Sequence, residues 1–294
     1  MLGEVLTASV TPFDSDGAVN LTKFRELAAF LVENGSDGLA VTASTGESAT
    51  LTDDERMALY SAAVDVVGGR ATVIAGTGTY DTRHSVHLTE QAHDLGVDGF
   101  LVVTPYYNKP PPRGIAEHVK AIAAVTDKPI VFYNIPARVV VKVEIETLAE
   151  LAQIPNVVAV KQAWDDIEDA RRIVEETGLQ LYAGDDNLIQ PFLELGAVGG
   201  ICVHTHVVGP QVKEQITSFR AGDVEGSRRI DEELAPAYEI LKVVVNPIAI
   251  KAALNLLGHD VGGLRLPLVE ATEEEQSQIR ACLERLGALQ PVSA

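Results

Sequence analysis

Cysteine is scarce in this chain of 294 residues, which contains only Cys202 and Cys282. Two cysteines cannot build a disulfide scaffold, and they indicate either a reducing compartment or a protein indifferent to redox conditions. Long hydrophobic runs are also missing, since none reaches the roughly 18 residues that a membrane-spanning helix requires. The first basic residue is Lys23, so the charged start of a secretory signal peptide is absent. We therefore expect a soluble cytoplasmic protein with no membrane partner.

Positive charge is the second shortage. The chain has 23 Lys and Arg residues against 42 Asp and Glu residues, which gives a net charge of −19. Such a surface repels the phosphates of nucleic acids and anionic lipids, so we expect no nucleic-acid partner. The glycine motifs that bind phosphates and dinucleotides are absent as well. Apolar residues are plentiful at 46%, enough for a sizeable core, and this excludes a disordered chain.

Eight short apolar runs alternate with longer amphipathic segments. The runs cover residues 5–10, 38–41, 72–76, 99–103, 130–134, 157–161, 180–184 and 199–203. The amphipathic segments cover residues 21–33, 52–67, 81–95, 115–125, 144–151, 166–177, 186–195 and 210–219. Eight such units predict an α/β fold, a closed (β/α)8 TIM barrel over residues 1–222, better than an open sheet. Residues 223–294 lack strand patterns and predict a small C-terminal helical subdomain, with helices over residues 223–241, 247–257 and 273–286.

Lys161 closes the sixth apolar run, and active sites of such barrels lie at the C-terminal ends of the strands. One interpretation is a lysine that extends its ammonium out of the barrel mouth into water. The other is a desolvated amine with a lowered pKa, which acts as a nucleophile. Position alone does not decide between them.

Tyr133 lies near the end of the fifth run and strengthens the second interpretation. With a side-chain period of two, Tyr133 shares a face with Val131, and Lys161 shares a face with Ala159. Neighbouring strands therefore point both side chains into one mouth. A tyrosine beside a carbonyl-binding lysine is a suitable proton carrier.

Other polar residues follow the same ends of the runs. Residues 42–48 place consecutive hydroxyls and a glycine before a capped helix, which indicates either a carboxylate pocket or an ordinary turn. Arg138 offers a free guanidinium for a substrate carboxylate or for a surface salt bridge. Tyr106 and Tyr107 form an adjacent pair that is typical of an exposed interface loop. His204 and His206 follow the eighth run in a zinc-binding pattern, but a third ligand is not evident, so we expect no metal.

Five motifs occur together in an order that resembles the pyruvate-dependent class I aldolase superfamily, which includes N-acetylneuraminate lyase and dihydrodipicolinate synthase. They are Ser44-Thr45-Gly46-Glu47, Thr104-Pro105-Tyr106-Tyr107, Tyr133-Asn134-Ile135-Pro136, Lys161 after its apolar run, and Gly184-Asp185-Asp186. Residues 246–248 and 264–267 are similar to the C-terminal region of that superfamily. The resemblance covers essentially the whole chain. Arg138 and the double tyrosine favour the dihydrodipicolinate synthase family within it.

The resemblance implies a catalytic role for four residues. Lys161 forms a Schiff base with pyruvate, and Tyr133 donates and accepts protons. Ser44 and a Tyr107 from a neighbouring subunit complete a proton relay. No metal or organic cofactor is implied, because the cationic imine itself withdraws electrons.

The resemblance also implies the substrate-binding positions. Thr45 and the main chain at Ile201 hold the pyruvate carboxylate, Arg138 binds the carboxylate of L-aspartate 4-semialdehyde, and Gly184 contributes to the same site. The implied product is 4-hydroxy-tetrahydrodipicolinate, on the route to diaminopimelate and lysine. The implied assembly is a homotetramer, a dimer of dimers.

Several residues depart from the usual pattern of the family. Ser44 replaces a threonine, Val139 and Val140 follow Arg138 where Thr-Gly is usual, and Trp164 follows the lysine strand. The alternative enzyme is another pyruvate aldolase, an N-acetylneuraminate or 2-keto-3-deoxy-sugar-acid lyase. A metal-dependent hydrolase built on the two histidines and a retired barrel that only binds ligands are more distant alternatives.

Regulation is the last expectation that the resemblance carries. Members inhibited by lysine hold it near the second-strand loop and the third helix, at positions that here read Asp53, Arg56, Tyr80 and His84. His84 offers no fixed negative charge for the ligand's ammonium, and Arg56 adds a like charge. We expect weak or absent feedback inhibition by lysine.

Overall fold

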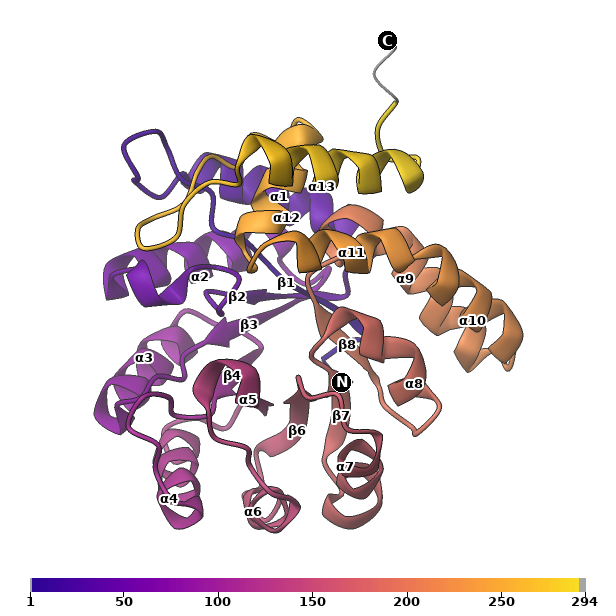
Figure 1. Ribbon diagram of the computed structural model, residues 1–294. Helices are drawn as coiled ribbons and strands as arrows, with labels where there is room; N and C mark the ends of the chain where they lie inside the picture. The colour runs from indigo at the N-terminus through magenta and orange to yellow at the C-terminus, as the bar shows by residue number, and fades with distance from the viewer. Residues whose placement is uncertain (1, 291–294) are drawn as a thin grey trace.

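Eight parallel strands form a closed barrel in the computed structural model, which describes residues 2–290. The strands are β1 Val5–Ala8, β2 Gly38–Val41, β3 Thr72–Gly76, β4 Gly99–Val103, β5 Ile130–Asn134, β6 Val157–Gln162, β7 Gln180–Ala183 and β8 Gly199–Cys202. Each strand pairs with the next, and β8 closes the barrel by pairing Ile201 with Leu6 of β1. The predicted (β/α)8 barrel is confirmed (Figure 1).

Helices follow the strands and surround the barrel. They are α1 Leu21–Glu33, α2 Asp53–Val67, α3 Thr82–Asp94, α4 Pro112–Ala123, α5 Pro136–Val139, α6 Ile145–Leu151, α7 Ile167–Arg172, α8 Ile189–Leu193 and α9 Thr205–Arg220. Short 3₁₀ turns, η1 Ser48–Thr50 and η3 Asp186–Leu188, lie after β2 and β7. The Thr52 hydroxyl and the Glu55 carboxylate form a capping box, which fixes the start of α2.

The apolar residues form two layers. The outer layer lies between the strands and the helices, while the inner layer fills the barrel itself. Inward-facing members of the inner layer are Leu6, Ala40, Ile74, Leu101, Val131, Ala159, Tyr182 and Ile201. Tyr182 is fully buried and donates its hydroxyl to the Gly3 carbonyl at 2.8 Å. The barrel is therefore a packed core, which leaves the C-terminal ends of its strands as the place for a site.

Several segments differ from the sequence-based predictions. The short helix α5 was not predicted, because four residues carry no period. The segment 166–177 divides into α7 and the π-helical turn η2, Ile173–Thr177. Helix α9 begins at Thr205, five residues before the predicted start, and is kinked at Val208 just ahead of Pro210. His204 and His206 therefore lie at the start of a helix, where the sequence pattern suggested the end of a strand.

The C-terminal helices are α10 Val224–Glu233, α11 Ala235–Val243, α12 Ile248–Leu256 and α13 Glu273–Arg285. The predicted helix over residues 223–241 is divided into α10 and α11. Pro236 lies in the first turn of α11, a position at which proline favours the start of a new helix. Figure 1 shows α11, α12 and α13 gathered at one side of the barrel. The Phe30 ring of α1 lies 4.3 Å from the His259 ring, which joins this group to the barrel. Within residues 2–290, no helix is both long and apolar enough to cross a membrane.

Candidate active site

Lys161 and Tyr133 lie side by side at the barrel mouth. The register of β5 and β6 pairs the two residues directly. The Lys161 Nζ atom is 4.1 Å from the centroid of the Tyr133 ring. Both residues are almost buried, at 4% and 5% exposure, so the amine and the phenol meet out of bulk water. The adjacency expected from the strand period is present.

The strands around Lys161 hold it from both sides. Tyr182 on β7 is its register partner across the other edge of β6. On the outer face, the Asn134 amide donates to the Gln162 side-chain oxygen at 3.0 Å and ties the ends of β5 and β6 together. Asp185 follows β7, where burial raises the pKa of its carboxyl while the positive charge of Lys161 opposes that rise. A lysine held in this way has an amine of fixed position, as a nucleophile requires.

A cavity of about 310 Å³ opens beside these residues. Its lining includes Ser44, Tyr106, Tyr133 and Arg138, together with Pro247 and Leu268 from the C-terminal segment. Thr45, Lys161, Gly184 and Ile201 are buried and are not among its lining residues. The cavity is large enough for a small acid and its reaction partner.

Tyr107 is not brought to the cavity. Its side chain is 90% exposed, and its backbone has a left-handed φ of 66°. Tyr106, its neighbour, lines the cavity instead and packs edge-on against Tyr80 at 5.3 Å between ring centroids. Within one chain, Tyr107 is therefore exposed to solvent and does not line the cavity beside Lys161.

The loop after β2 is tightly held. Thr42 and Glu47 both adopt left-handed backbone conformations, with φ of 54° and 55°. The Thr42 hydroxyl lies 2.5 Å from the Tyr60 hydroxyl, and the Thr11 hydroxyl donates to the Gly46 carbonyl at 2.7 Å. These contacts fix the turn that carries Ser44 into the cavity wall.

Asn246 connects the two polar sides of the site. Its side-chain amide donates to the Thr45 hydroxyl at 2.9 Å. Its main-chain carbonyl accepts from Nη2 of Arg138 at 2.8 Å. The guanidinium that the sequence analysis treated as free is therefore anchored at one nitrogen, while the residue remains exposed. The sequence indicated Asn246 only as part of a C-terminal motif. No pattern in the residues around it predicts its hydrogen bond to Thr45, which lies 201 positions away in the chain.

Ile201 lies on β8, and Gly184 directly follows β7. Ile201 is fully buried on β8, so its side chain faces the barrel interior. Gly184 follows β7, where an added Cβ would lie 2.8 Å from both the Cβ and the amide nitrogen of Ala163. Only glycine allows the strand ends to approach this closely.

His204 and His206 do not converge on one point. Both ring nitrogens of His206 form hydrogen bonds with main-chain groups. Nδ1 lies 2.7 Å from the Val203 carbonyl, and Nε2 lies 3.3 Å from the Val10 nitrogen. His204 instead belongs to a buried cluster with Asp186 and Cys202, whose ligand atoms lie within 4.8 Å of one another.

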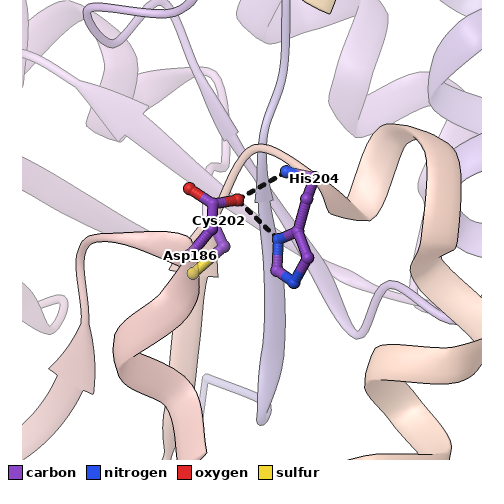
Figure 2. Close-up of side chains that lie close together, drawn as sticks. All are labelled: Asp186, Cys202 and His204. Carbon is purple, nitrogen blue, oxygen red and sulfur yellow. Dashed lines mark hydrogen bonds and ion pairs between the residues drawn. The ribbon is translucent and has the colours of Figure 1, made fainter. Parts of the chain in front are cut away.

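Figure 2 shows how the cluster is used. The Asp186 Oδ1 atom lies 2.5 Å from the His204 Nδ1 atom and accepts from the main-chain N–H groups of His204 and Val203. Burial raises the pKa of Asp186, but His204 and these N–H donors outweigh it and leave the pKa below its ordinary value. Two ligand atoms on one zinc ion lie about 3.3 Å apart. The Asp186 Oδ1 and His204 Nδ1 atoms are only 2.5 Å apart, so they bind each other directly. The cluster closes the turn after β8.

Comparison with known proteins places this geometry in a family. A model of the Dihydrodipicolinate synthetase family matches residues 1–286. The chain belongs to this family. The 4-hydroxy-tetrahydrodipicolinate synthase of Desulforamulus reducens is 46% identical over 98% of both chains, and that of Moorella thermoacetica is 45% identical over 98% of this chain and 99% of its own.

Solved structures of the dihydrodipicolinate synthetase family superpose closely. The DHDPS of Cyanidioschyzon merolae, solved with lysine bound, is 42% identical with a TM-score of 0.96 and covers 98% of this chain and 99% of its own. A monomeric dihydrodipicolinate synthase variant is 39% identical with a TM-score of 0.95, over 98% of both chains. The expected family membership is confirmed.

Proposed function

We propose that this chain, a lyase of the dihydrodipicolinate synthetase family, condenses pyruvate with L-aspartate 4-semialdehyde to form 4-hydroxy-tetrahydrodipicolinate. The observation that carries the proposal is the Lys161 amine, 4.1 Å from the Tyr133 ring at a nearly dry barrel mouth. Relatives of 44–46% identity bear the name of this activity. The reaction requires no metal or organic cofactor, because a pyruvate–lysine imine supplies the electron sink.

The chemistry begins at Lys161. Its neutral amine attacks the keto carbon of pyruvate, and loss of water leaves a cationic imine. Removal of a methyl proton then gives an enamine, whose carbon attacks the aldehyde of the second substrate. The amine of that substrate displaces Lys161 from the imine carbon, which closes the ring and frees the enzyme. We assign proton transfer at the imine to Tyr133, and the closeness of its ring to the Lys161 amine supports this assignment.

The proton path continues from Tyr133 to Ser44 and to a tyrosine of a second subunit. Ser44 and Tyr133 line the same cavity, whereas Tyr107 is exposed on the surface. We propose that the partner subunit's Tyr107 completes the relay in a homotetramer, a dimer of dimers. A monomeric variant exists among the similar solved structures, so assembly is a matter for measurement. Sedimentation at assay concentration tests it, and a fully active monomer would contradict it.

The carboxylates of the two substrates bind on opposite sides. The Thr45 hydroxyl and the main chain at Ile201 receive the pyruvate carboxylate, and Gly184 contributes to the same site by letting the ends of β6 and β7 lie close together. Arg138, anchored at Asn246 and exposed at its other nitrogens, receives the carboxylate of the semialdehyde. We propose that residues 1–222 carry these groups and that residues 223–294 support them from one side.

A substrate panel tests the proposed function. The purified chain is assayed with pyruvate and L-aspartate 4-semialdehyde, and in parallel for cleavage of N-acetylneuraminate and 2-keto-3-deoxy sugar acids. The condensation is expected to exceed every cleavage rate in kcat/KM by orders of magnitude. Cleavage of a sugar acid at a higher kcat/KM would assign the chain to another aldolase of the superfamily.

A further inference from the structure

A buried ion pair joins the loop after β2 to the C-terminal helices. Lys251 on α12 places Nζ 2.9 Å from Oε1 of Glu47, and the side chains are 1% and 0% exposed. The same ammonium donates to the Gly263 carbonyl and lies 4.3 Å from the centroid of the Phe13 ring. Segments from both ends of the chain therefore meet at one charged group.

The second carboxylate oxygen of Glu47 is occupied as well. Oε2 accepts from the main-chain N–H of Arg265 at 3.0 Å. The Arg265 guanidinium then donates to the carbonyls of Gly17 and Thr50, each at 2.8 Å, and to the Glu55 carboxylate. Glu47 is thus held by two donors of the C-terminal segment, one at each oxygen.

Glu47 lies only three residues after Ser44. Its left-handed conformation, with φ of 55°, is one that a non-glycine residue keeps only when its surroundings enforce it. Its N–H donates to the Ser44 carbonyl at 3.2 Å. The positions of the Ser44 and Thr45 hydroxyls therefore depend on where the Glu47 carboxylate is anchored.

Stability is a poor explanation for this pair. Taking two charges out of water is costly, and apolar side chains of similar size often give a fold at least as stable. Charged hydrogen bonds at both oxygens of the Glu47 carboxylate are directional, so they fix its position and orientation. We propose that Glu47 and Lys251 are positioning residues that hold the loop in the conformation in which it receives pyruvate. This inference rests on the proposed function of Ser44 and Thr45.

The test is the double variant Glu47→Gln with Lys251→Met. It removes both charges, keeps the side-chain length at position 47, shortens the side chain at position 251 by one atom and leaves an acceptor for the Arg265 N–H. The double variant is expected to fold with a thermal midpoint close to that of the native chain. Its KM for pyruvate is expected to rise roughly tenfold to hundredfold, because small misplacements at a site have effects of this size. The rate of borohydride-trapped pyruvate adduct formation is expected to fall in parallel.

The matched control is an ion pair at the opposite end of the same strand. Lys213 on α9 places Nζ 2.8 Å from both carboxylate oxygens of Asp37, which immediately precedes β2. Lys213→Met is expected to lower the thermal midpoint and to leave the KM for pyruvate unchanged. The control distinguishes the general effect of losing an ion pair next to β2 from the specific effect of losing the Glu47–Lys251 pair after the C-terminal end of β2.

Three outcomes would overturn the proposal. One is a folded double variant with native KM and native adduct rate. Another is an equal rise in KM in the Lys213→Met control. If the double variant does not fold, Glu47→Gln alone is measured, and a native KM there is equally contrary. If the native chain itself traps no pyruvate, the proposed function is wrong. That result differs from a failure of the positioning role, in which the native chain traps pyruvate and the double variant does so equally well.

Discussion

Asn246 donates its side-chain amide to the Thr45 hydroxyl at 2.9 Å, across 201 residues of sequence. Because the Asn246 carbonyl also accepts from Arg138, one residue contacts both groups to which we assign substrate carboxylates. The C-terminal segment thus reaches into the site.

Removing this amide should loosen Thr45. Asn246→Ala leaves the main-chain contact with Arg138 and deletes the bond to Thr45, a loss of about 1 kcal/mol. We expect the KM for pyruvate to rise several-fold while the KM for the semialdehyde changes little. Asn255→Ala is the control, since the Asn255 amide donates to Gly262 within the C-terminal segment. A larger effect on the semialdehyde than on pyruvate would contradict the assignment.

Arg138→Ala should separate the two half-reactions. Its exposed guanidinium becomes desolvated only against the carboxylate of the second substrate, so its loss should reduce kcat/KM for the semialdehyde by roughly 2 kcal/mol or more. Formation of the pyruvate adduct, measured by borohydride trapping, should change far less. Equal damage to both steps would show that Arg138 acts on the loop or on pyruvate.

The pair of Glu55 and Arg265 predicts an acid-sensitive contribution to stability. Its hydrogen bonds to Arg265 lower the pKa of Glu55 from 4.5 to about 2. A lowered folded-state pKa stabilises the fold above pH 4.5, and this stability is lost as the pH falls towards 2. Because the pair is partly exposed and screened by solvent, the contribution is about 1 kcal/mol. Chemical denaturation of the native chain and of Glu55→Gln should therefore differ at pH 7 and converge in acid.

The chain offers a close control for that measurement. Glu275 occupies the same position in the capping box of α13, and it has no ion-pair partner within residues 2–290. Glutamine can replace glutamate in such a box, so Glu275→Gln keeps the cap and should cost little at either pH. A difference between the native chain and Glu55→Gln that persists unchanged at low pH would refute the ion-pair origin.

Lysine should inhibit this enzyme weakly or not at all. The Asp53 carboxylate, which could receive the ligand's ammonium, already lies 2.9 Å from the His84 ring nitrogen. The Arg56 guanidinium is buried and donates to the Ser48 carbonyl at 2.5 Å. The DHDPS of Cyanidioschyzon merolae, which was solved with lysine bound, serves as the positive control for lysine binding. Strong inhibition at submillimolar lysine in a steady-state titration would overturn this expectation.

Much of the fold follows from periods that are local in the sequence. Apolar runs broken by capped amphipathic segments predict the barrel, and the period of two places Lys161 and Tyr133 together. What the sequence could not show is the set of contacts made across the chain. Lys251 has an ordinary place on an apolar helix, and only the folded chain brings it to Glu47. Boundaries also shifted at Pro210 and Pro236, where helices start or bend for reasons beyond the hydrophobic period.

The most direct test of the central claim is reductive trapping at Lys161. The native chain is incubated with pyruvate and borohydride, digested, and mapped by mass spectrometry. One reduced pyruvate per chain is expected on Lys161, and Lys161→Ala is expected to remain folded and carry none. An adduct on another lysine, or an active enzyme that forms no adduct, would contradict the account.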